Sequence, residues 1–107
     1  MDTFMWTLGH VYHMSLETVR AEITKTDKEI IRLIAHRQDL AGKIAKIKVH
    51  AGMPVHDELR TSEVLNTVFD QAVEAKIDPV AVQNIFEQLI AMSEERQREC
   101  SGDGNLP

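Results

Sequence analysis

Residues 15–54 read SLETVRAEITKTDKEIIRLIAHRQDLAGKIAKIKVHAGMP and form one long periodic segment. Ser15 is a suitable helix cap, and Glu17 places a negative charge in the first turn. Apolar or heptad-seam residues recur at steps of three and four, at Leu16, Val19, Ile23, Thr26, Ile30, Leu33, Arg37, Leu40, Ile44 and Ile47. This rhythm predicts a helix of roughly 50 Å that is packed along its length and runs to about His50. Gly52 and Pro54 are expected to end it.

Two shorter helices are predicted after this turn. Asp57 can cap the first, which stops near Lys76, and Asp78 before Pro79 is a strong start signal for the second, which fades near Cys100. Their apolar faces comprise Leu65, Val68, Phe69, Ala72 and Val73 in the first and Val82, Ile85, Phe86, Leu89 and Ile90 in the second. No segment has the alternating pattern of a strand. The predicted fold is therefore all-α, with one long and two shorter helices.

The lengths of these helices have a consequence for assembly. The two shorter helices are each about 20 residues, or roughly 30 Å long, so a hairpin made of them does not cover the whole apolar stripe of the first helix. A second copy of the chain is the simplest cover, and we expect a homodimer.

Length, charge and cysteine content narrow the function classes. The 107 residues have room for one domain, placed at residues 15–100, with an N-terminal extension of unknown role at 1–14 and a disordered tail at 101–107. Met14 is an alternative start, and residues 1–14 lack the features of a secretory signal. The net charge of −5 disfavours nucleic acid and acidic membranes as partners. The single cysteine, Cys100, forms no internal disulfide, so a reducing, cytoplasmic setting is expected.

The informative residues are polar ones at positions where the pattern calls for apolar ones. Arg37 occupies a seam position, and Lys48 follows eleven residues later, almost three full turns, on nearly the same stripe. In the third helix the apolar face continues into Ser93 and Gln97. Because unpaired buried cations are costly, Arg37 and Lys48 either pair with carboxylates of the protein or bind an anionic ligand.

Arg60 and Arg20 are further cations near the starts of the second and first helices. Arg20 lies 28 residues from Lys48 on one helix, so roughly 40 Å separates them. If both serve one site, Arg20 must come from a partner whose first helix runs antiparallel. The five histidines lack the cysteines or acids that would complete a metal site at the usual spacing, so we expect no metal and solvated histidines.

Residues 19–60 resemble the core of the all-helical chorismate mutases, and residues 85–97, IFEQLIAMSEERQ, are similar to the third-helix segment of that family. The matching positions are Arg20, Asp27, Leu33, Arg37, Leu40, Ala41, Lys48, Pro54, Val55, Asp57, Arg60, Ser93 and Gln97. The resemblance implies an intertwined homodimer with two equivalent sites, each shared between subunits. It also implies chorismate as the substrate and a unimolecular rearrangement to prephenate, in phenylalanine and tyrosine biosynthesis, that needs no cofactor.

The resemblance also implies a role for each site residue. Arg37, with Arg20 of the partner subunit, would bind the two substrate carboxylates through bidentate hydrogen bonds. Lys48 and Gln97 would donate to the ether oxygen, where negative charge develops. Arg60 would add positive potential, and Asp57 and Ser93 would orient neighbouring groups. The departure is Thr61, where many members of the family carry a glutamate that accepts a hydrogen bond from the substrate hydroxyl.

Two alternatives to the mutase reaction stay open at this point. Isochorismate-pyruvate lyases resemble the mutases and use a similar cationic pocket, and Thr61 leaves room for that activity. A non-catalytic helical dimer would bind the metabolite without consuming it, and association with another enzyme of aromatic biosynthesis is also compatible with the sequence. If the mutase assignment holds, the rate should be nearly flat with pH because Gln97 does not titrate.

Overall fold

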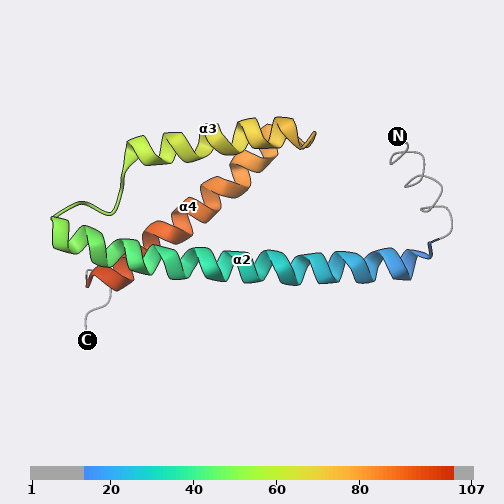
Figure 1. The fold of residues 1–107 in the computed structure, drawn as a ribbon, viewed down its shortest axis with the longest axis horizontal. Coiled ribbons are helices and arrows are strands. Elements are labelled where there is room, and N and C mark those ends of the chain that lie inside the picture. The colour runs from blue at the N-terminus through green and yellow to red at the C-terminus, as the bar shows by residue number, and fades with distance from the viewer. Residues whose placement is uncertain (1–13, 103–107) are drawn as a thin grey trace. The chain divides into compact units, whose positions relative to one another are not determined.

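The computed structural model describes residues 14–102, and all of its regular secondary structure is helical over that range. The helices are α2 (Leu16–Ala51), α3 (Glu58–Glu74) and α4 (Pro79–Ser101) (Figure 1). The prediction of one long and two shorter helices is confirmed. The N-terminal extension was predicted at residues 1–14 and the disordered tail at 101–107, of which residues 1–13 and 103–107 lie outside the described residues. The start of the predicted tail is wrong by one residue, because Ser101 is the last residue of α4.

Local sequence signals set the ends of α2. At its start, Ser15 Oγ accepts a hydrogen bond from the Thr18 amide at 3.0 Å, as a capping hydroxyl does. At its end, Gly52 adopts a φ of 68°, a left-handed conformation that a residue with a Cβ atom rarely adopts. The amide of Met53 then donates to the Lys48 carbonyl oxygen at 2.8 Å, so the chain leaves the helix where the glycine was expected to end it.

Aspartate side chains begin the other two helices. Asp57 accepts from the Arg60 amide, and Asp78 accepts from the Val80 and Ala81 amides. Pro79 occupies the first turn of α4, where its missing N–H costs nothing. The predicted ends are close to the observed ones: α3 stops at Glu74, two residues before the predicted end, and α4 runs one residue beyond Cys100.

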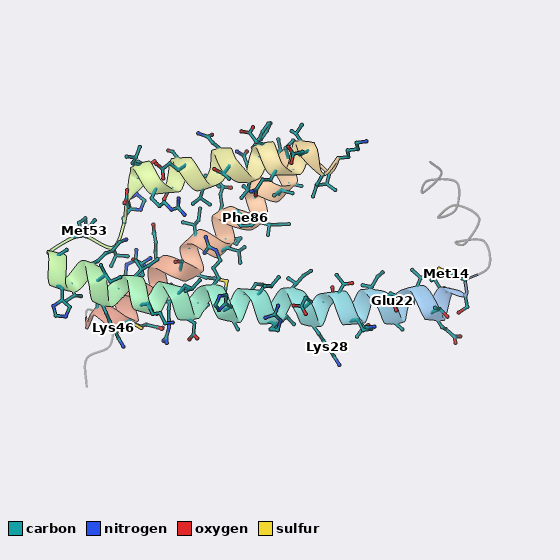
Figure 2. All side chains as sticks on the ribbon, in the orientation of Figure 1. Met14, Glu22, Lys28, Lys46, Met53 and Phe86 are labelled. Carbon is teal, nitrogen blue, oxygen red and sulfur yellow. The ribbon has the colours of Figure 1, made fainter. Side chains whose placement is uncertain are left out.

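The chain divides into two compact units, at the boundary between Leu33 and Ile34. The described part of the first unit is the N-terminal half of α2. Its large apolar side chains are exposed, with Leu16 at 63% and Ile31 at 65% of their full surface. Figure 2 shows the side chains of this segment, Glu22 and Lys28 among them, projecting from the helix.

The second unit comprises the rest of α2 together with α3 and α4. The hairpin of α3 and α4 brings α4 back across the C-terminal half of α2 (Figure 1). The two helices are close at Gly42, where an added Cβ atom would be in van der Waals contact with Cys100 Sγ, at 3.4 Å. The buried apolar residues are all small or medium-sized, namely Ala41, Ala45, Val68 and Ala72. Among residues 14–102, no helix is both long and apolar enough to cross a membrane.

Candidate active site

The second unit contains a pocket of about 320 Å³ between α2, α3, α4 and the segment that joins α2 to α3. It is lined by Arg37, Leu40, Ala41, Ile44, Lys48, Val55, Asp57, Arg60, Thr61, Val64, Ile90, Ser93, Glu94 and Gln97. Seven of the eight site residues predicted from the sequence are in this lining. The eighth, Arg20, is an exposed residue of the first unit and does not line the pocket.

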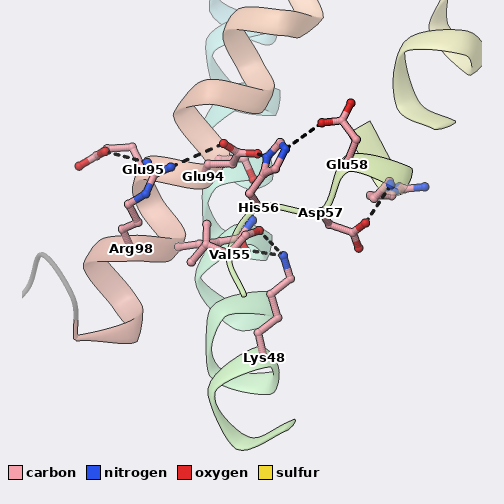
Figure 3. A network of polar contacts seen from close by, with 11 residues as sticks. Lys48, Val55, His56, Asp57, Glu58, Glu94, Glu95 and Arg98 are labelled. Atoms are coloured by element: carbon pink, nitrogen blue, oxygen red, sulfur yellow. Dashed lines mark hydrogen bonds and ion pairs between the residues drawn. The ribbon is translucent and has the colours of Figure 1, made fainter. Parts of the chain in front are cut away.

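Lys48 and Gln97 lie in direct contact on the pocket wall. Lys48 Nζ donates to Gln97 Oε1 at 2.9 Å and to the Val55 carbonyl oxygen at 2.7 Å (Figure 3). Gln97 is only 6% exposed, and its Nε2 donates to Ser93 Oγ at 3.3 Å. These contacts fix both side chains, because burial and hydrogen bonding leave each of them few alternative rotamers.

Arg37 supplies a second positive charge to the pocket. Its Nη1 donates to the Leu89 carbonyl oxygen at 3.0 Å, and among residues 14–102 it forms no ion pair with a carboxylate. Burial lowers the pKa of Arg37, and the nearby positive charge of Arg60 lowers it further. An arginine stays protonated despite such a shift. Two neighbouring guanidinium groups of which one lacks a carboxylate partner are suited to binding an anion.

The remaining predicted residues frame the pocket at the start of α3 and on α4. Asp57 Oδ1 accepts a hydrogen bond from the backbone amide of Arg60 at 3.0 Å. The same hydrogen bond caps α3 and fixes the backbone of Arg60. The Arg60 side chain is exposed and makes a long contact of 3.4 Å with Glu63. Thr61 is half-buried and lines the pocket beside Arg60. Its hydroxyl is available as both donor and acceptor.

One feature of the lining was not predicted. Glu94 places a carboxylate in the pocket wall, and His56 Nδ1 lies 2.7 Å from Glu94 Oε2 (Figure 3). The other ring nitrogen, Nε2, lies 2.9 Å from Glu58 Oε1. The hydrogen bond to Glu94, followed by that to Glu58, raises the pKa of His56. The His56 side chain is 55% exposed, in keeping with the expectation of solvated histidines, but its contacts with two carboxylates were not predicted.

Comparison with known proteins assigns most of the chain to one group. The family model for chorismate mutase type II matches residues 19–98. A chorismate mutase of Methanocaldococcus jannaschii is 30% identical over 84 residues, which are 78% of this chain and 85% of the relative. A bifunctional chorismate mutase/prephenate dehydratase of Aquifex aeolicus is 38% identical over 53 residues, 50% of this chain and 15% of that protein. The T-protein of Haemophilus influenzae is 27% identical over 79 residues, 74% of this chain and 21% of its own length.

Proposed function

The chain belongs to the type II chorismate mutase family, and we propose that the pocket of the second unit is where it rearranges chorismate to prephenate. The observation that carries this proposal is the contact of Lys48 with Gln97 in a pocket that Arg37 and Arg60 also line. In the reaction an ether C–O bond breaks while a C–C bond forms within the same molecule. The enzyme therefore has to hold a compact conformer and stabilise the charge that develops on the ether oxygen.

Lys48 and Gln97 each retain a hydrogen-bond donor for that oxygen. Lys48 Nζ carries three hydrogens, and two of them point to Val55 and Gln97. Gln97 Nε2 carries two hydrogens, and one of them points to Ser93. The hydrogen left on each group has no partner among the described residues. Donors that are already fixed require little reorganisation during the reaction, which is why they stabilise the transition state more than water does.

Arg37 and Arg60 are suited to the negative charges of the substrate. Chorismate carries two carboxylates, and a guanidinium can bind a carboxylate through two parallel hydrogen bonds. In this proposal Arg37 binds one carboxylate within the subunit, Arg60 adds positive potential at the pocket, and Arg20 of the partner subunit completes the binding of the substrate. Asp57 and Ser93 position Arg60 and Gln97 respectively, and Thr61 faces the substrate hydroxyl.

The apolar surface of α2 supports the intertwined homodimer that this assignment of Arg20 requires. Ile23, Ile30 and Leu33 are between 49% and 54% exposed, and the Ile47 side chain is 65% exposed. These residues belong to one heptad stripe, and such a stripe is normally covered by another helix. A second copy of α2 running antiparallel would cover it and bring Arg20 into the pocket. The cytoplasmic setting and the association with another pathway enzyme stay predictions.

Mixing two inactive variants tests the shared site. We expect Arg20→Ala and Lys48→Ala each to be inactive alone, because each removes a group that every site needs. In a mixed dimer one site lacks both residues and the other is intact. Since about half of the dimers are mixed after exchange, the mixture should recover about a quarter of wild-type activity. If verified subunit exchange restores no activity, Arg20 does not act across the interface.

Identifying the products tests the reaction itself. The purified protein is incubated with chorismate, and separately with isochorismate, and the products are identified by proton NMR. We expect prephenate from chorismate without any added cofactor. Pyruvate and salicylate from isochorismate, without prephenate from chorismate, would assign the chain to the lyase reaction. Binding of chorismate without turnover would assign it to a non-catalytic role.

A further inference from the structure

Glu94 is an unexpected residue in a pocket for a dianion. Its side chain is 19% exposed and lines the same pocket as Arg37 and Lys48. A carboxylate at this place repels the carboxylates of the substrate, and the repulsion is strong where water is partly excluded. The negative charge of Glu94 therefore needs a compensating positive charge for the pocket to bind a dianion well.

His56 is the group placed to supply that charge. Its two ring nitrogens face the carboxylates of Glu94 and Glu58, at 2.7 and 2.9 Å. A neutral imidazole carries only one N–H and can donate to only one of them, whereas the imidazolium donates to both. The geometry thus fits the protonated form, and the two carboxylates raise the pKa of His56 accordingly.

We propose that protonated His56 is a positioning residue that neutralises Glu94 and holds its carboxylate at the segment joining α2 to α3, and so keeps the affinity for the substrate high. This inference rests on the proposed function, because it needs the pocket to bind the chorismate dianion. His56 itself is not in the lining of the pocket and acts only through Glu94.

The other charged groups around His56 do not replace it. On α4, Arg98 Nη2 lies 3.7 Å from Glu94 Oε1, but the same guanidinium also pairs with Glu95 at 3.2 Å (Figure 3). On α3, Glu58 is exposed and adds negative charge. On α2, Lys48 Nζ is directed to the carbonyl oxygen of Val55, the residue before His56, and to Gln97. Of the two ion pairs that Glu94 forms among the described residues, the one with His56 is the shorter, at 2.7 Å against 3.7 Å for Arg98.

The first expected result is a KM for chorismate that depends on pH while kcat does not. His56 is protonated below its raised pKa, so KM is low there. As the pH rises through that pKa, Glu94 loses its compensating charge, and KM should increase roughly three- to tenfold. The substrate carboxylates are ionised throughout a range of roughly pH 5.5 to 8.5, so their titration does not contribute.

Four variants separate charge compensation from a merely structural role. His56→Asn keeps a donor near the Nδ1 position without the charge, and should have the high KM at every pH. His56→Arg keeps the charge at every pH, and should have the low KM throughout. Glu94→Gln should have a low KM that is insensitive to pH. Glu58→Gln, the control outside the pocket, should keep the low KM in acid and move its rise to lower pH, because one of the two carboxylates that favour the imidazolium is gone.

The decisive measurement adds His56→Asn to the Glu94→Gln background. We expect no further change in KM, because no carboxylate is left to compensate. If His56→Asn raises KM as much in this background as in the wild type, or if it lowers only kcat, the proposal is overturned. Circular dichroism of each variant confirms the helical fold. A wild-type protein that does not turn over chorismate would instead contradict the proposed function, so the two failures are distinguishable.

Discussion

Replacing Lys48 with methionine should lower kcat for chorismate by roughly a hundred- to a thousandfold, the usual cost of losing one fixed donor to a developing negative charge. Methionine has a similar length but neither a charge nor a donor, so the change removes the contacts of Nζ with Val55 and Gln97 and the hydrogen left for the ether oxygen. KM should change less than kcat, because the interaction is strongest in the transition state. The loss of chorismate absorbance gives both constants.

Lys46→Met is the matched control for this variant. Lys46 is an exposed residue of the same helix, two positions before Lys48 (Figure 2). It does not line the pocket. Its replacement should leave kcat within about twofold of the wild type, because an exposed residue outside the pocket does not contact the substrate. Surface substitutions of this kind also change the stability of a protein little. A Lys48→Met protein that is folded and keeps more than roughly a tenth of the wild-type kcat would show that Lys48 does not stabilise the negative charge that develops on the ether oxygen.

Gln97→Glu should convert a flat pH–rate profile into one that rises in acid. At neutral pH the new carboxylate would be ionised, would accept from Lys48 Nζ as Oε1 of the glutamine does, and would have no hydrogen for the ether oxygen. We expect a kcat roughly a hundredfold below that of the wild type under these conditions. As the pH falls through the pKa of the introduced glutamate, the protonated form gains an O–H donor and kcat recovers.

The control for this variant is Gln88→Glu, the same change on an exposed residue of α4 outside the pocket. Its profile should stay flat like that of the wild type. Equal profiles for the Gln97→Glu and Gln88→Glu proteins would show that the amide of Gln97 does not donate to the reacting oxygen. Rate measurements at saturating chorismate across the pH range separate these results, since they report kcat rather than binding.

The helices could be predicted because the signals that define them are local. Asp57 and Asp78 cap α3 and α4 through hydrogen bonds to amides two or three residues away, so a short window of sequence contains the whole interaction. Gly52 ends α2 for an equally local reason, its positive φ. The ends of α3 and α4 were less accurate by one or two residues, as helix ends generally are.

Much of the pocket could be predicted because the helical period indicates on which face of a helix each side chain lies. Arg37 and Lys48 share one stripe of α2, and Gln97 continues the apolar face of α4. All three side chains were therefore expected to face one site between the two helices. The pair of His56 and Glu94 was not predictable, because 38 residues separate the two and neither breaks a local pattern. The homodimer was predicted from the length of the apolar stripe of α2 and from the family resemblance, and it stays a proposal.

The most direct test of the central proposal is the binding of a stable mimic of the transition state. A bicyclic dicarboxylate that carries an ether oxygen in its ring has the compact shape and both charges of the rearranging molecule. Calorimetry should give a Kd at least about a hundredfold below the KM for chorismate in the wild type, and most of this advantage should be lost in Lys48→Met. Binding no tighter than that of chorismate, or equal binding by both proteins, would contradict the account that the pocket of Arg37, Lys48 and Gln97 is built for this rearrangement.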